Sequence, residues 1–204
     1  MNNRLKLVAL AASVGLTLAG IALAGPPFRA KPFEFDPMAT GIVDAAWIPH
    51  EGLPDSGNGD HALLLVKDGL TVTNASSGAI IQGVAGITLT ELGFDVRDDG
   101  HCGAGAPRFN VTTTGGMLHF VGCAAGPTTG ALTDPQGNTW TRKRWNSAAL
   151  LALAFPPILA GSTVEKISIV FDEGTDTGPD FTGFTHLDNI DINGVLIGKP
   201  GNAS

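Results

Sequence analysis

The stretch that decides the fold is "HCGAGAPRFNVTTTGGMLHFVGC", residues 101–123, because it predicts a β-hairpin closed by a disulfide. Apolar and polar residues alternate over 108–112 and over 117–121, on either side of the turn sequence Thr-Thr-Gly-Gly at 113–116. Such a hairpin would bring position 123 opposite roughly position 106. We expect the apolar residues of the two strands to share one face: Phe109, Val111, Leu118 and Phe120.

Cys102 and Cys123 are the two cysteines of the chain, and an even pair in an oxidising compartment predicts a disulfide. The glycine-rich residues 103–106 would let Cys102 fold back to meet Cys123. A closed loop of this length stabilises a protein by ~3 kcal/mol because it restricts the unfolded chain. The alternative, a catalytic cysteine beside His101, is disfavoured because a lone thiol outside the cytosol tends to oxidise.

The N-terminus indicates export. Residues 1–6 are basic, residues 7–22 are mostly apolar, and Ala22-Leu23-Ala24 precedes Gly-Pro-Pro, which together are typical of a signal peptide cleaved after Ala24. An uncleaved anchor helix is the alternative, since the apolar run is nearly long enough to cross a bilayer. We expect residues 1–24 to be removed and residues 25–204 to form one secreted or periplasmic domain.

The charge balance excludes one class of partner. The chain has 12 Lys+Arg against 19 Asp+Glu, a net charge of −7, and loss of Arg4 and Lys6 with the signal peptide would make it −9. Nucleic-acid binding depends on cations that neutralise phosphates, so we expect no nucleic-acid partner. The apolar stretch 148–159 is too short to span a bilayer and contains two prolines, so it predicts a buried core segment and no membrane span.

Most of the remaining pattern has a period of two residues, and no long stretch has a helical period. Asn193-Gly194, between two apolar runs, is a strong signal for a tight hairpin turn. The sequence therefore predicts a single all-β domain, an antiparallel β-sandwich of jelly-roll type from about residue 28 to 200. The expected strands outside the disulfide hairpin lie at 61–66, 78–82, 87–96, 139–145, 164–171 and 187–197.

The order of these features resembles the galactose-binding-like jelly rolls found in many carbohydrate-binding modules. The resemblance depends on short motifs: Phe33-Glu34-Phe35, Trp47 before a glycine-rich loop, the strands at 89–97 and 167–171, Trp140 and Trp145, and Leu187-Asp188-Asn189-Ile190. The segment around Cys102 is also similar to one in a group of secreted bacterial proteins of unassigned role. The resemblance implies a β-sandwich that binds carbohydrate.

The acidic segment "FDEGTDTGPDFTGFTHLDNI", residues 171–190, is the candidate cation site. Asp172, Asp176 and Asp180 supply the kind of carboxylate oxygens that calcium prefers. A solvated turn is the alternative interpretation, because Asp and Gly are also common in ordinary turns. Strand alternation predicts that Asp188 shares a face with Ile190 and Ile192. A buried carboxylate there must meet a cation, an arginine or backbone N–H groups. The resemblance implies a structural calcium held by Asp188 together with Glu34.

Sugar binding requires flat apolar faces, and Trp47, Trp140 and Trp145 are the candidates for platforms. Burial in the core is the alternative for each of them. Arg142 and Arg144 are candidate contacts for an anionic glycan, or else part of a solvated strand face.

No serine-hydrolase elbow, zinc-protease motif or phosphate loop occurs in the sequence. We therefore predict a secreted, non-catalytic protein that binds carbohydrate or another cell-surface ligand, with a structural calcium. A structural or adhesive surface protein that contacts other proteins is the first alternative. A hydrolase with an acidic site around residues 172–180 is the second.

Overall fold

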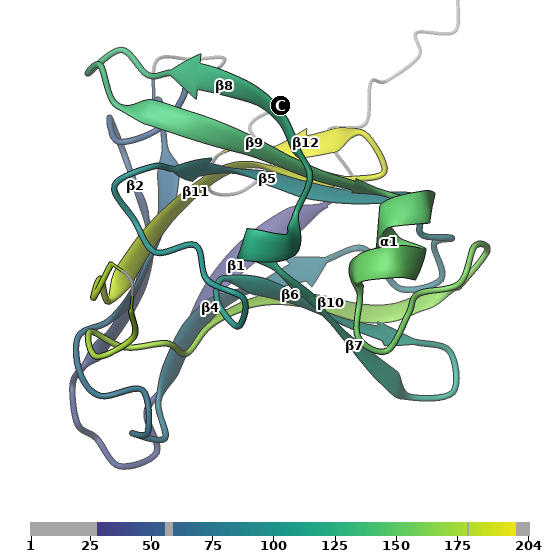
Figure 1. The fold of residues 1–204 in the computed structure, drawn as a ribbon, viewed down its shortest axis with the longest axis horizontal. Coiled ribbons are helices and arrows are strands. Elements are labelled where there is room, and N and C mark those ends of the chain that lie inside the picture. Colours follow the sequence, from purple (N-terminus) through teal and green to yellow (C-terminus); the bar gives the residue numbers. More distant parts are fainter. Residues whose placement is uncertain (1–27, 56–58, 179, 199–204) are drawn as a thin grey trace, which may run out of the picture.

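The computed structural model describes residues 28–55, 59–178 and 180–198. These residues form two antiparallel β-sheets packed face to face, so the predicted all-β sandwich is confirmed (Figure 1). The expected signal peptide, residues 1–24, lies outside the described residues.

The smaller sheet has five strands, and the larger sheet has seven. The smaller sheet runs in the order β1 (Arg29–Phe35), β4 (Ser76–Gln82), β10 (Val164–Phe171), β6 (Arg108–Thr113), β7 (Met117–Gly122). The larger sheet runs β2 (Val43–Ile48), β3 (Ala62–Lys67), β11 (Phe184–Ile192), β5 (Glu91–Arg97), β9 (Thr139–Asn146), β8 (Thr128–Thr133), and β12 (Val195–Ile197) also pairs with β11. Chain neighbours such as β4 and β5, or β10 and β11, lie in different sheets, so the connections between the sheets gather loops at the ends of the sandwich.

The core lies between the sheets, and three aromatic rings in it connect one sheet to the other. Phe94 of β5 lies 5.3 Å from Phe109 of β6 and 5.4 Å from Trp145 of β9, measured between ring centroids. The Phe109 and Trp145 rings meet edge to face at 6.0 Å. Aromatic contacts of this geometry add to the stabilisation from buried area, so this trio fastens the two sheets together.

The disulfide hairpin forms as predicted, but the face of its second strand was predicted wrongly. Phe109 pairs with Val121 and Val111 pairs with His119, so His119 and Val121 face the core while Leu118 and Phe120 point outward. The turn begins one residue later than expected, with Thr113 paired to Met117. Because side chains alternate along a strand, a shift of one residue exchanges its two faces.

The alternation along β11 was also predicted wrongly. Leu187, Ile190 and Ile192 belong to the apolar cluster of the core, whereas Asp188 and Asp191 do not belong to it. The register shifts between Asp188 and Asp191, and Asn189 adopts a φ of 44°. This β-bulge inserts one residue and reverses the alternation from that point.

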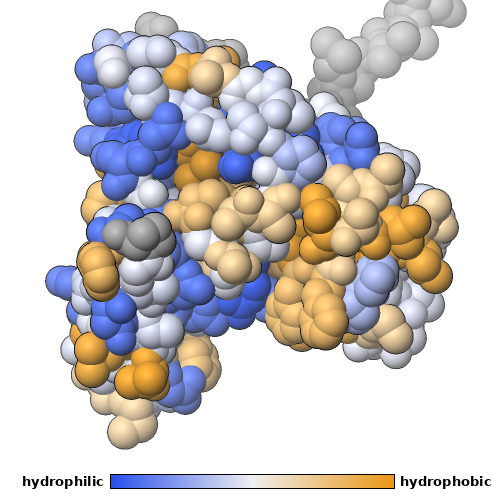
Figure 2. All heavy atoms as spheres, in the orientation of Figure 1, coloured by the Kyte–Doolittle hydropathy of each residue, from blue (hydrophilic) through white to orange (hydrophobic). Residues whose placement is uncertain are grey.

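The apolar stretch 148–159 is only partly buried, which corrects the expectation of a core segment. It contains the two-turn helix α1 (Ser147–Leu153), which Asn146 caps by accepting a hydrogen bond from the Ala149 N–H. Leu150 and Ile158 enter the core, but Phe155 is 76% exposed. Figure 2 shows the resulting apolar patch over α1 and β7, which comprises Met117, Leu118, Phe120, Leu151, Leu153, Phe155 and Leu159. No helix in the described part of the chain is long and apolar enough to cross a membrane.

Candidate functional site

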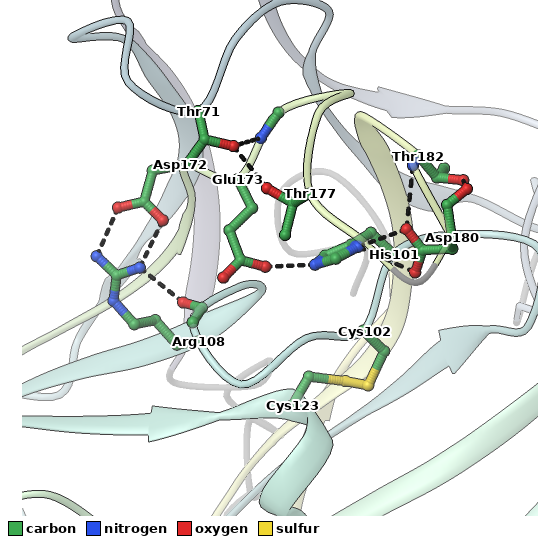
Figure 3. A network of polar contacts seen from close by, with 12 residues as sticks. Thr71, His101, Cys102, Arg108, Cys123, Asp172, Glu173, Thr177, Asp180 and Thr182 are labelled. Atoms are coloured by element: carbon green, nitrogen blue, oxygen red, sulfur yellow. Dashed lines mark hydrogen bonds and ion pairs between the residues drawn. A yellow bond between two sulfur atoms is a disulfide. The ribbon is translucent and has the colours of Figure 1, made fainter.

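We consider two places in the described structure as candidate sites. The first is the network where the acidic loop, residues 172–183 between β10 and β11, meets the disulfide loop, residues 98–107 between β5 and β6 (Figure 3). The second is a pocket lined by residues of β3, β5 and β11 and of the acidic loop, which we call the outer pocket.

His101 is the centre of the network. Its side chain is 1% exposed and lies between two carboxylates, with Nδ1 at 2.8 Å and 3.0 Å from the Asp180 oxygens and Nε2 against Glu173 (Figure 3). The ring therefore has a carboxylate within hydrogen-bond distance of each of its two nitrogens. Burial raises the pKa of Asp180, but hydrogen bonds from His101 and from the Thr182 N–H outweigh it and hold that pKa below its ordinary value.

The glycines of the disulfide loop make room for the carboxylate of Glu173. A Cβ added at Gly103 or at Gly105 would overlap the Glu173 carboxylate oxygens. The Cys102–Cys123 disulfide, with Cα atoms 5.3 Å apart, ties the same loop to the end of β7 and confirms the predicted bond. The sequence Cys-Gly-Ala-Gly-Ala is therefore shaped around a residue that lies 68 positions or more away along the chain.

Two cations extend the network toward β6 and β3. Arg108 donates to both oxygens of Asp172 at 2.6 Å and 2.8 Å and to the Gly105 carbonyl at 2.7 Å. Lys67, 1% exposed, donates from Nζ to the carbonyl oxygens of Thr71, Thr73 and Asp172, each at 2.8 Å. Burial lowers the pKa of Lys67, while Asp172 and Asp176 oppose that shift. All three ammonium protons are used, so Lys67 holds the loops together.

The predicted calcium ligands do not form a cage. Asp172 pairs with Arg108, Asp180 pairs with His101, and Asp176 accepts hydrogen bonds from the N–H and the hydroxyl of Thr71 at 2.7 Å. Glu34 is exposed on β1, in the opposite sheet from Asp188. Among the described residues, no three His, Cys, Asp or Glu side chains are placed to hold a metal ion. The donor set therefore does not fit calcium, because the loop carboxylates already have protein partners.

Asp188 is buried, and its carboxylate accepts hydrogen bonds from the Leu53 N–H at 2.7 Å and the Asn189 N–H at 2.5 Å. This agrees with the backbone alternative for this residue. Burial raises the pKa of Asp188 to about 8 against those two N–H groups, and the nearby charges of Asp55 and Asp95 add to the rise. The group is thus protonated at neutral pH.

The three predicted tryptophan platforms lie in or against apolar clusters. Trp140 and Trp145 are fully buried, and Trp140 donates from Nε1 to Asp134 at 3.0 Å. Trp47 is half-buried between β1 and β3, and its Nε1 donates to the Ala30 carbonyl at 3.1 Å. As they stand in this structure, Trp140 and Trp145 offer no exposed ring face to a sugar.

The two predicted anion contacts are paired with carboxylates of the same sheet. Arg142 binds both oxygens of Asp95 at 2.9 Å. Arg144 lies 3.2 Å from Asp95 and 3.1 Å from Asp191. Their charges are therefore largely neutralised within the protein.

The outer pocket has a volume of about 470 Å³ and a mostly apolar lining. It is lined by Leu64, Val66, Asp68, Arg97, Thr175, Gly183, Phe184 and His186. Strand pairing brings these residues together, because Phe184 lies opposite Val66 and His186 lies opposite Leu64 in the β11–β3 register.

His186 is the unusual residue of the outer pocket. It is 7% exposed, its Nε2 lies 3.2 Å from Nη2 of Arg97, and its Nδ1 has no hydrogen-bond partner among the described residues. Burial lowers the pKa of His186 to about 4, and the positive charge of Arg97 acts in the same direction. Arg97 itself is held by Asp99 and Glu51, both at 2.7 Å. The imidazole is therefore neutral at neutral pH.

A second hollow of about 440 Å³ lies beside the network, lined by Phe35, Val72, Lys67, Asp172, Glu173 and neighbouring residues of 71–76. Its charged groups are those already described: Lys67 binds three carbonyls, Asp172 binds Arg108, and Glu173 contacts His101. The outer pocket is the better candidate because one of its buried polar atoms still lacks a partner.

Sequence reasoning missed Lys67, Asp68 and His186 as members of either place. The one available signal was Lys67, a charged residue at the end of the apolar run 62–66. Comparison with protein-family models, curated proteins and solved structures finds no match for this chain. Its function must therefore be argued from the geometry of these sites.

Proposed function

We propose that this protein is an exported, non-catalytic β-sandwich that binds a small ligand, in first place a carbohydrate, in the outer pocket. The single observation that carries the proposal is the pocket itself, which combines apolar walls with a few polar groups and an unsatisfied buried nitrogen. This combination is typical of small-molecule sites, where apolar walls supply affinity and a few polar groups fix orientation.

Phe184 provides the flat face that the buried tryptophans do not. It lines the pocket and is only half-buried, and its ring meets the His186 ring edge to face at 5.6 Å. The C–H face of a pyranose packs well on such a ring, while its hydroxyls need polar partners nearby. The resemblance of the sequence to galactose-binding-like jelly rolls supports the same class of ligand.

The acidic loop supports binding better than hydrolysis. A general acid or base must reach its substrate, yet His101 is almost completely buried between Glu173 and Asp180. Asp172 is occupied by a two-point bond to Arg108. We therefore assign the acidic loop an architectural role.

The proposal is tested by titrating the exported protein with a panel of neutral, acidic and amino sugars in a calorimeter. Phe184→Ala should weaken any binding about tenfold or more, since it removes the ring face. Phe181→Ala is the matched control, because Phe181 is exposed and lies outside the pocket lining. A panel without any binding sugar would overturn the proposal.

A protein-contact function is the second candidate, and the apolar patch over α1 and β7 favours it. Seven large apolar side chains that are exposed together are unusual for a protein without a partner surface. Leu151→Ser together with Leu159→Ser should reduce any self-association seen by analytical ultracentrifugation and leave sugar binding unchanged. A wild-type protein that stays monomeric and captures no partner would remove this candidate.

A further inference from the structure

We infer that the outer pocket selects a ligand that carries an ammonium group on a hydroxylated body, as an amino sugar with a free amine does. This inference rests on the proposed function and names the chemistry of its ligand. It depends on three residues that line the pocket: Asp68, Phe184 and His186.

The charge around the pocket favours a cation. Asp68 is exposed on the rim, and none of the ion pairs among the described residues involves it. Arg97 is the one cationic residue of the lining, and Glu51 and Asp99 both bind it. Asp44, exposed on β2 opposite Val66, adds another negative charge nearby. The local field is therefore negative, which attracts cations and repels carboxylates.

The aromatic wall fits the same charge. An ammonium group over the face of an aromatic ring is attracted by the ring quadrupole. Phe184 is the one aromatic hydrocarbon ring of the lining, and Asp68 lines the same pocket. A ligand cation in this pocket thus has an aromatic face and a carboxylate within one site.

His186 adds the requirement for an oxygen on the ligand. The guanidinium of Arg97 can only donate, so Nε2 of His186 must accept, and the neutral ring carries its hydrogen on Nδ1. That N–H is buried without an acceptor among the described residues. An unsatisfied buried donor is costly, and a hydroxyl or ring oxygen brought in by a ligand would satisfy it after a small movement of the side chain. A simple alkylammonium ion has no such oxygen.

An acidic sugar fits less well, although an arginine is present. Each nitrogen of the Arg97 guanidinium already has a partner, in Asp99, Glu51 or His186, and two carboxylates already balance its charge, so it attracts a ligand carboxylate only weakly. A carboxylate in the pocket would also lie near the unpaired charge of Asp68. We therefore expect the order of affinity to be amino sugar, neutral sugar, acidic sugar.

The experiment compares glucosamine, N-acetylglucosamine, glucose, glucuronate and propylammonium by calorimetry on the exported protein. It is carried out at low salt and at a pH where the amine is protonated. We expect glucosamine to bind about tenfold more tightly than glucose or N-acetylglucosamine, because an ion pair and a cation–π contact together are worth ~1.4 kcal/mol. The preference should shrink as salt is added.

Asp68→Asn should reduce the tenfold preference for glucosamine over glucose to near equality, measured as the ratio of the two dissociation constants. Glu34→Gln is the matched control, since Glu34 is an exposed carboxylate on the other sheet. Equal binding of glucose and glucosamine would overturn this inference and leave the proposed function standing. Propylammonium, which has no oxygen, would overturn the requirement for a hydroxylated body if it bound as tightly as glucosamine. No binding of any probe would overturn both proposals.

Discussion

The network around His101 and the outer pocket beside His186 each bury a histidine near carboxylates and an arginine, and the two histidines have opposite surroundings. His101 has a carboxylate at each ring nitrogen. His186 has a guanidinium at one nitrogen and nothing at the other among the described residues. The first arrangement gives both ring nitrogens a partner and joins two loops, whereas the second leaves one buried ring nitrogen without a partner among the described residues.

This difference separates architecture from function in physical terms. Matched buried charges fix one geometry, because removal of either partner strands the other in a medium of low polarity. Unmatched or strongly shifted groups reduce stability, and they are retained most often where a site needs them. His186 and Asp188, both on the larger sheet, have strongly shifted pKa values, and measurements on them can be compared with the effect of removing His101.

The largest effect is expected from Asp188. Its pKa is raised from 3.8 in the unfolded chain to about 8, so its contribution to stability is complete below pH 4 and is lost as the pH rises through 8. Four pKa units correspond to at most about 5 kcal/mol. Urea unfolding across this range should show the decline, and Asp188→Asn should flatten it. Equal stability of the wild type at pH 5 and pH 9 would contradict the assignment, and Asp44→Asn, an exposed carboxylate, is the control.

Removal of His101 should be nearly as costly. His101→Ala leaves Glu173 and Asp180 facing a cavity without their shared partner, so we expect a loss of about 3–4 kcal/mol in the free energy of unfolding. Denaturant titration measures it, with His50→Asn as the control at an exposed histidine. A loss below about 1 kcal/mol would show that the network adds little to stability.

His186 should limit stability in acid. Its pKa falls from 6.5 to about 4 on folding, so its contribution is present above pH 6.5 and is lost as the pH falls through 4, by about 3 kcal/mol. Arg97 opposes protonation of the ring, while Asp99 and Glu51 favour it. His186→Gln should be less sensitive to acid than the wild type by that amount. Identical acid unfolding of the two proteins would refute the neutral, buried histidine.

Calcium should have the smallest effect. The carboxylates of Asp172, Asp176 and Asp180 already accept hydrogen bonds from the protein, so neither excess calcium nor EDTA should move the melting temperature by more than about 1 °C. Differential scanning calorimetry measures this. A calcium-dependent rise of several degrees that Asp176→Asn abolishes would restore the acidic loop as a cation site.

Most of the strands, the disulfide and the hairpin turn at Asn193-Gly194 were predictable because each depends on local pattern, whereas β2 and β8 were not among the expected strands. The strand expected at 164–171 coincides with β10 (Val164–Phe171), and the tight turn separates β11 from β12 as the two turn residues require. The faces of Leu118 and Asp188 were not predictable. Each depends on one residue more or less in a turn or bulge, which changes no local composition.

The residues of the outer pocket could hardly be predicted from the sequence. Asp68 and His186 are more than a hundred positions apart and meet only because β3 pairs with β11. The acidic loop was recognised by its composition, but composition does not show whether a carboxylate faces water, a metal or Arg108. Trp140 and Trp145 likewise look the same in sequence whether they are buried or exposed.

The sequence by itself determined the alternation of apolar side chains, the pair of cysteines and the glycines that shape the turns, because these act over a few neighbouring residues. The tertiary structure decided which charges meet. Glu173 and Asp180 reach His101, and Asp68 forms no ion pair within the described part of the chain, because sheet pairing joins segments that are distant along the chain. Whether a polar group is matched depends on its neighbours in space, and that property distinguishes the closed network from the open pocket.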